Sequence, residues 1–134
     1  MFFYPHGELH FEIEGKFQII KGTGPWNVES IVKSADDVSK IHNELYGTKW
    51  CVLAIIHGQP IHTPDAAQLL VETVIQDKKN GRIASALVLD ESDNPNFGRH
   101  HIAQIYKEAG EKFDFFNDIN NAKKWLYNQL NACE

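Results

Sequence analysis

The fold is decided by residues 50–74, which read WCVLAIIHGQPIHTPDAAQLLVETV. The first seven residues are apolar without alternation, a pattern typical of a strand that is covered on both faces of its sheet. Thr63 and Pro64 then open a helix. Thr63 is expected to be its N-cap, and Pro64 stands in the first turn, where a missing N–H costs nothing. A buried strand followed directly by a helix predicts a parallel sheet with helical crossovers.

Similar patterns extend the prediction over the rest of the chain. Alternating apolar and polar residues predict a hairpin of two strands at 9–14 and 16–21, with a tight turn at Gly15. The glycine-rich residues 22–25 are expected to end the second strand. Further strands are predicted at 50–56, 83–89 and 112–116, and helices at 28–45 with a possible break at 34–37, at 64–80, at 100–109 and at 119–130.

These elements define an α/β fold in the order ββαβαβαβα. The sheet is expected to be mostly parallel with an antiparallel first strand and covering helices. The 134 residues are interpreted as a single domain, long enough to fold without a disulfide or a metal. Residues 1–8 contain Phe2, Phe3 and Tyr4. They are interpreted as an arm that packs on the domain or on a second copy of the chain in a homodimer.

The net charge of the chain argues against two classes of negatively charged partner. Thirteen basic and eighteen acidic residues give a net charge of -5, which argues against nucleic acid or an anionic membrane as the main partner. The apolar run at 51–56 is too short for a transmembrane segment, and the first residues show no signal-peptide pattern. Cys51 is expected to be buried in its strand, and with Cys133 it suggests no disulfide framework. We therefore expect a cytoplasmic protein.

A binding site is expected where the parallel strands end and the next helices begin, since open α/β sheets place ligands at this edge. Trp26 either anchors a partner there or fills the gap between the first helix and the sheet. Imidazoles with an ordinary pKa of about 6.5 would make the edge sensitive to pH between about 5 and 7. The edge gathers Trp26, Asn27, His57, His62, Thr63, Asp65, Asp90, Ser92, Asp93 and Arg99.

Three stretches of the chain resemble the STAS domain, the fold of bacterial anti-sigma-factor antagonists, and more closely its SpoIIAA-like branch of small uncharacterised proteins. They are Gly24-Pro25-Trp26-Asn27, His62-Thr63-Pro64-Asp65, and EAGEKFDFF at 108–116 followed by NAKKWL at 121–126. The resemblance covers nearly the whole chain. It implies the fold predicted above and a regulatory module that binds a protein partner and is not an enzyme.

The resemblance also makes Thr63 a candidate phosphoacceptor, because it stands where the antagonists carry their phosphorylated serine. A phosphate there would add about -1.5 to -2 charges at a helix N-terminus, which favours anions. The antagonists' motif is Asp-Ser-Ser-Gly. This chain departs from it with His62 in place of the aspartate and Pro64 in place of the second serine.

Three functional hypotheses remain open. A protein-binding module predicts an exposed surface at the strand ends. A carrier or sensor of a small apolar or lipid-like ligand, as in SEC14-like domains of related topology, predicts an enclosed apolar pocket between a helix layer and the sheet. A metal-assisted enzyme predicts convergent polar groups around a cavity, drawn from His57, His62, His100, His101 and Asp90. The spacing of the histidines matches no metal motif, so no metal, cofactor or catalytic residue is predicted.

Overall fold

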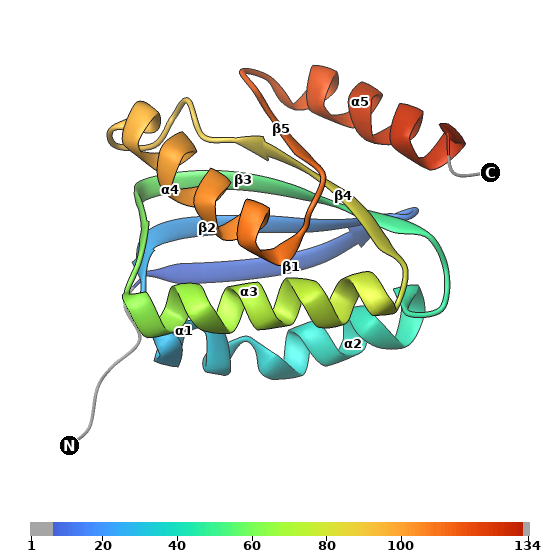
Figure 1. The fold of residues 1–134 in the computed structure, drawn as a ribbon, viewed down its shortest axis with the longest axis horizontal. Helices are drawn as coiled ribbons and strands as arrows, with labels where there is room; N and C mark the ends of the chain where they lie inside the picture. The colour runs from blue at the N-terminus through green and yellow to red at the C-terminus, as the bar shows by residue number, and fades with distance from the viewer. Residues whose placement is uncertain (1–6, 133–134) are drawn as a thin grey trace.

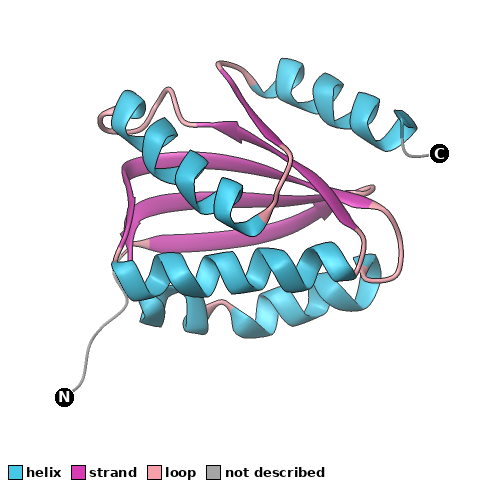
Figure 2. Ribbon diagram, viewed as in Figure 1, coloured by secondary structure: helices cyan, strands magenta, loops and turns pink. Residues whose placement is uncertain are grey.

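One five-stranded sheet carries helices on both of its faces (Figures 1 and 2). The structure is a computed structural model and describes residues 7–132. Its elements, in chain order, are β1 (Glu8–Glu14), β2 (Phe17–Trp26), α1 (Val28–Lys33), α2 (Ala35–Leu45), β3 (Trp50–His62), α3 (Pro64–Lys79), β4 (Arg82–Val88), α4 (Pro95–Ala109), β5 (Phe113–Phe116) and α5 (Ile119–Ala132).

The sheet has the strand order β1-β2-β3-β4-β5. Only β1 runs antiparallel to its neighbour, and the other pairs are parallel, as predicted. The hairpin turn lies at Gly15, whose φ of 60° is readily adopted by glycine alone. All the parallel strands therefore end at one edge, where α3 and α4 begin.

The central strand β3 supplies side chains to the core on both faces of the sheet, which explains its continuous apolar sequence. Leu53 packs with Phe17 and Leu126 on the face covered by α5. Ala54 packs with Val74 and other residues of α3 and α4 on the opposite face. Burying a leucine side chain contributes about 1.5–3 kcal/mol, so both faces stabilise the sheet.

Two strands run further than predicted. The prediction that residues 22–25 end β2 is wrong, because the strand continues to Trp26 through a cis peptide bond between Gly24 and Pro25. Likewise β3 continues to His62, and Trp26 is its partner in the register. The physical reason is close approach: a Cβ on Gly24 would collide with the backbone of Gln59. This glycine permits strand pairing and does not mark a turn.

Smaller differences concern the helices and the start of the chain. The first long helix is broken at Ser34 into α1 and α2, the break that 34–37 suggested. Helix α4 begins at Pro95 and not at His100, because the side chain of Asn94 accepts a hydrogen bond from a backbone N–H of its first turn. Ile119, expected to face inward, is 39% exposed. Of the predicted arm, residues 1–6 lie outside the described residues, and Glu8 belongs to β1.

Candidate functional site

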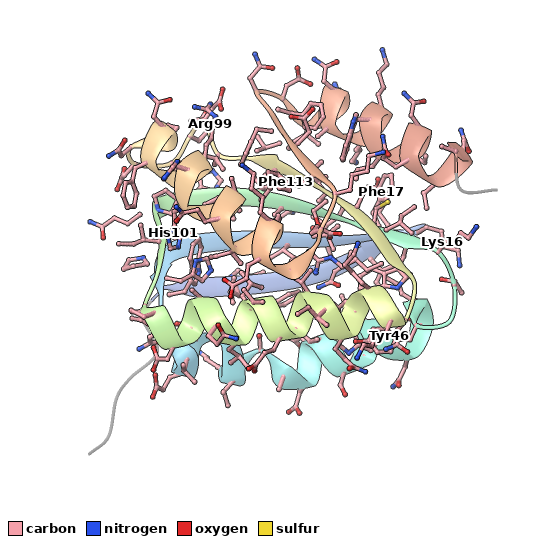
Figure 3. The ribbon with its side chains drawn as sticks, viewed as in Figure 1. Lys16, Phe17, Tyr46, Arg99, His101 and Phe113 are labelled. Atoms are coloured by element: carbon pink, nitrogen blue, oxygen red, sulfur yellow. The ribbon has the colours of Figure 1, made fainter. Side chains whose placement is uncertain are left out.

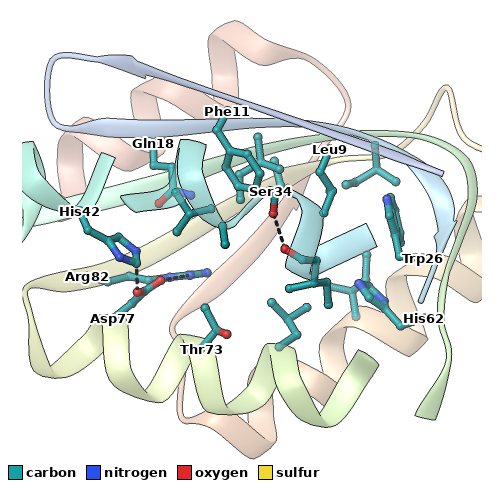
Figure 4. Close-up of a pocket in the computed structure, with 18 of the residues that line it drawn as sticks. Leu9, Phe11, Gln18, Trp26, Ser34, His42, His62, Thr73, Asp77 and Arg82 are labelled. Atoms are coloured by element: carbon teal, nitrogen blue, oxygen red, sulfur yellow. Dashed lines mark hydrogen bonds and ion pairs between the residues drawn. The ribbon is translucent and has the colours of Figure 1, made fainter. Parts of the chain in front are cut away.

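A cavity of about 410 Å³ lies between helices α1–α4 and one face of the sheet (Figure 4). Its walls are mainly apolar, with side chains such as Phe11, Ile20, Val38 and Ile102 from four different elements. Val32, Ala35 and Ser39 line the same cavity and are exposed to solvent. The mouth therefore lies beside the break between α1 and α2.

The break is a consequence of local capping. Asn27 caps α1 by accepting a hydrogen bond from the backbone N–H of Ser30 at 3.0 Å, as the sequence predicted for this residue. One turn later the Ser34 hydroxyl donates to the Ile31 carbonyl at 2.7 Å, and the chain restarts as α2. Residues of both α1 and α2 therefore line the cavity, on either side of the break.

One end of the cavity is polar. Gln18 lies in β2 between Phe17 and Ile19, which pack on the α5 side of the sheet, so its side chain points into the cavity. It is only 4% exposed, and its Oε1 atom has no hydrogen-bond partner among residues 7–132. A buried polar atom without a partner is uncommon in folded proteins.

Buried charges stand beside Gln18 in a closed network. Arg82 places its Nη1 atom 3.1 Å from Asp77 Oδ2 and its Nε atom 2.6 Å from Glu111 Oε2. Lys78 binds the other oxygen of Glu111 at 2.8 Å. Burial alone would raise the pKa of Glu111, but Arg82, Lys78 and a hydrogen bond from Ser85 together hold it below its ordinary value. Two cations and two anions leave this network without net charge.

His42 of α2 and Tyr46, which directly follows this helix, add two aromatic side chains at the same end. Tyr46 donates its hydroxyl hydrogen to Asp77 Oδ1 at 2.6 Å, and its ring stacks on His42. Burial lowers the pKa of His42 although Asp77, 3.3 Å from its Nε2 atom, acts in the opposite direction. His42 is therefore an uncharged imidazole at neutral pH.

The predicted edge holds a row of neighbouring rings that we call the aromatic row: Trp26, His62, His101 and Phe97. Trp26 is tilted against His62, and the other two pairs are stacked. His101 Nε2 accepts the backbone N–H of His62 at 3.1 Å and lies 3.1 Å from His62 Nδ1. Trp26 and His62 also line the cavity, whereas Phe97 is 51% exposed. The row connects the cavity to the surface at the start of α4. Figure 3 places His101 and Arg99 at one end of the molecule and Tyr46 at the other.

The expectation of ordinary imidazoles at this edge is wrong for His62. Burial, together with the neighbouring His101, lowers the pKa of His62 to about 3. Burial also lowers the pKa of His101. The two rings form an uncharged pair at neutral pH, since a proton on either would lack the solvation that water provides.

Trp26 is buried at this edge, in one core cluster with Val71 of α3 and Ile102 of α4, and it lines the cavity. Its side chain is 2% exposed and donates its Nε1 hydrogen to the Glu8 carbonyl at 3.1 Å. So buried a side chain presents no surface anchor to a protein partner. The sequence predicted that Trp26 lies at this edge. In the structure its side chain lines the cavity.

The other predicted edge residues have local partners. Thr63 caps α3 as predicted, accepting from the Ala66 N–H at 3.4 Å and donating to Asp65 Oδ1 at 2.7 Å. This hydrogen bond lowers the pKa of Asp65. Asp90 binds Arg99 at 2.7 Å in a partly exposed ion pair. His57 is exposed beside Thr23 of β2, and Asp93 is also exposed, whereas Ser92 is buried.

The polar end was missed by sequence reasoning because its members are far apart in the chain: Gln18, His42, Asp77, Arg82 and Glu111. Two signals were available. Asp77 follows Val74 on the buried stripe of α3, and Arg82 opens an apolar strand. Among residues 7–132, no group of three His, Cys, Asp or Glu side chains is arranged to hold a metal ion. Within the same residues, no helix has the length and apolar character needed to cross a bilayer.

Comparison with solved structures shows the fold. The chain is similar to an uncharacterised protein of the DUF3478 family with a SpoIIAA-like fold from Shewanella loihica PV-4. The two share 13% sequence identity with a TM-score of 0.67, over 94% of this chain and 98% of that chain. No family model matches the sequence, and no curated protein matches it either. The chain therefore has a SpoIIAA-like fold, as the three resembling stretches implied.

Proposed function

We propose that this protein is a binding module that holds a small, mainly apolar molecule in the cavity between α1–α4 and the sheet. The observation that carries this proposal is the cavity, about 410 Å³ with mainly apolar walls. Small-molecule sites are typically apolar cavities of roughly 300–1,000 Å³ with a few polar groups. Protein cores leave few voids larger than a water molecule, so this volume is more than a packing defect.

The cavity favours the ligand hypothesis over the other two. An apolar pocket between a helix layer and the sheet is the feature expected of a carrier or sensor. A metal-assisted enzyme is supported less, because the titratable groups of the cavity, such as Arg82 and Asp77, are bound to one another. The SpoIIAA-like fold supports a regulatory role, in which the occupied and empty forms differ in what they bind.

The test is saturable binding of the hydrocarbon dye diphenylhexatriene, followed by its fluorescence. We expect one dye per chain, and at least tenfold weaker binding by Val38→Trp, because Val38 lines the cavity and the larger ring would fill it. Lys40→Trp is the matched control, since Lys40 lies on the exposed side of the same helix. Dye binding that is not saturable, or that survives Val38→Trp unchanged, would contradict the proposal.

A second candidate function is protein binding at the strand edge, favoured by the exposed ring of Phe97. Phe97 stacks on His101 at the outer end of the aromatic row. Aromatic side chains are frequent anchors of protein interfaces. The test is copurification from the native cell, comparing the parent with Phe97→Ala and with Tyr127→Ala, another exposed aromatic residue on the distant helix α5. A partner or a second copy of the chain lost only with Phe97→Ala would support this function.

Phosphorylation of Thr63 would regulate the second candidate function, protein binding at the strand edge. Its hydroxyl stands at the start of α3, next to the Asp65 carboxylate. A phosphate would therefore concentrate negative charge beside the aromatic row and change which partners bind there. Intact-mass analysis of protein from its native cell tests this directly. If no phosphorylated fraction is found under the growth conditions sampled, and Thr63→Glu binds partners like the parent, Thr63 is a helix cap only.

A further inference from the structure

We infer that the cavity selects uncharged molecules with a hydroxyl or N–H group at one end, and that the Gln18 side chain recognises this group. The inference rests on the proposed function and names the chemical class of its ligand. Gln18 is 4% exposed and lines the cavity, and its Oε1 atom lacks a hydrogen-bond partner among the described residues. A ligand that donates a hydrogen bond supplies the missing partner.

The fold itself does not require a polar side chain at position 18. Its neighbours Phe17 and Ile19 are apolar core residues, and an apolar side chain at 18 would continue that pattern without leaving a buried polar atom unpaired. A carboxamide has an accepting oxygen and a donating NH₂ group, and rotation about its last side-chain bond exchanges them. Gln18 can therefore bind a hydroxyl group as acceptor or as donor.

The charges around the cavity exclude an ionised ligand group. Arg82 is the one cationic residue among the described lining residues, and it is held by Asp77 at 3.1 Å and by Glu111 at 2.6 Å. Burial keeps the imidazoles of His42 and His62 neutral by lowering their pKa values. A carboxylate or phosphate in the cavity would lose its hydration without meeting a free counter-charge, which is strongly unfavourable.

The shape of the cavity assigns the two ends of such a ligand. Gln18, His42, Asp77 and Arg82 gather at one end in Figure 4, and Trp26 and His62 at the other. The side chains between the two ends are mainly apolar, and the hydroxyls of Ser34 and Thr73 there donate to backbone carbonyls. The polar group of the ligand would lie against Gln18 and His42. Its hydrocarbon part would extend toward Trp26. An uncharged amphiphile with one polar end fits this arrangement.

The test is displacement of bound diphenylhexatriene by decanol and by decanoate, which have chains of equal length, at pH 8. We expect decanol to displace the dye at a concentration at least tenfold lower than decanoate. With Gln18→Met, we expect the affinity for decanol, taken relative to the affinity of the same variant for the dye, to weaken about three- to tenfold, the effect of one lost hydrogen bond. Gln104→Met is the matched control at an exposed glutamine and should leave both unchanged.

The outcomes separate this inference from the proposed function. The inference would be overturned if decanoate displaced the dye as well as decanol or better, or if Gln18→Met bound decanol as the parent does. Saturable dye binding would in either case still support the cavity as a ligand site. Absence of saturable dye binding by the parent would overturn both. Because the dye has no hydrogen-bonding group, saturable dye binding also shows that Gln18→Met is folded. Gln18→Leu serves as a second variant if it is not.

Discussion

At the scale of single residues, Glu111 compensates the charge of the buried Arg82. Its carboxylate lies 2.6 Å from Arg82 Nε and 2.8 Å from Lys78 Nζ, and its side chain is fully buried. This residue follows the end of α4, whereas Arg82 opens β4, so the pair fastens two distant parts of the chain. Without Glu111, the two cations Arg82 and Lys78 would have Asp77 as the one remaining carboxylate of the network, so one positive charge would lack compensation.

We predict that Glu111→Gln lowers the free energy of unfolding by about 3–5 kcal/mol, the usual cost of breaking a buried ion pair. Urea denaturation at neutral pH measures it. Glu108→Gln, an exposed change near the end of α4, is the control and should cost less than about 0.5 kcal/mol. A loss for Glu111→Gln as small as the control's would show that water reaches the network and solvates Arg82.

His62 makes the folded state sensitive to mild acid. Its pKa is about 3 in the folded protein, against an ordinary value of 6.5 in the unfolded chain. Below about pH 6.5 the unfolded chain therefore binds a proton that the folded protein does not, and stability falls as the pH falls toward 3. Above about pH 6.5 both states carry a neutral ring, and His62 adds no pH dependence.

We predict that the parent loses up to about 2 kcal/mol more than His62→Phe between pH 7 and pH 5. Phenylalanine retains a ring that can pack on Trp26 but binds no proton. Urea denaturation of both proteins at the two pH values measures the difference. Equal losses, or a His62 imidazole that titrates near pH 6.5 by NMR, would contradict the prediction.

At the scale of elements, the close pairing of β2 with β3 depends on Gly24. A Cβ at this position would collide with backbone atoms of Gln59, which cannot move aside as a flexible side chain would. The pairing carries both strands to the edge, where Trp26 and His62 line the cavity. The same glycine therefore shapes one end of the candidate site.

We predict that Gly24→Ala destabilises the protein more than Gly15→Ala does. Gly15 has open space around its missing Cβ, and alanine there costs about 1–2 kcal/mol because φ is 60°. Gly24→Ala must in addition separate two paired strands, so it should also weaken binding of diphenylhexatriene. Thermal unfolding and dye titration of both variants measure this. An equal effect of the two changes would mean that the strands adjust freely.

At the scale of the whole molecule, the sheet separates the candidate site from a second core. The cavity lies on the face covered by α1–α4, whereas α5 packs its buried residues Ala122 and Leu126 against the other face (Figure 1). The two faces share the strands but not the side chains, because successive residues of a strand point in opposite directions. Stability and binding can therefore be changed separately.

We predict that Leu126→Ala lowers stability by about 2–5 kcal/mol, since Leu126 is completely buried between α5 and the sheet. The affinity for diphenylhexatriene should remain within twofold of the parent at a temperature where the variant is folded. Chemical denaturation measures the loss of stability, and dye titration measures the affinity. A large change in dye affinity would mean that α5 and the cavity are mechanically coupled.

Local sequence determined the elements and their order. The apolar run at 50–56 predicted a strand covered on both faces, Asn27 and Thr63 predicted helix starts, and Gly15 predicted the hairpin turn. Each of these signals acts within a few residues, since capping and side-chain periodicity are local properties of the chain. The strand directions followed from them, because a helical crossover between two strands of one sheet favours a parallel pair. The strand order came from the structure.

Only the tertiary structure decided the site. In the sequence, Gln18 is one polar residue among apolar ones. In the structure, the strands place it under α2 and beside the pair of Asp77 and Arg82. The sequence predicts an ordinary pKa for His62. In the structure, burial against Trp26 and His101 removes water from the ring and lowers its pKa. Burial, unpaired polar atoms and cavity volume arise from residues far apart in the sequence, so no local pattern of residues contains them.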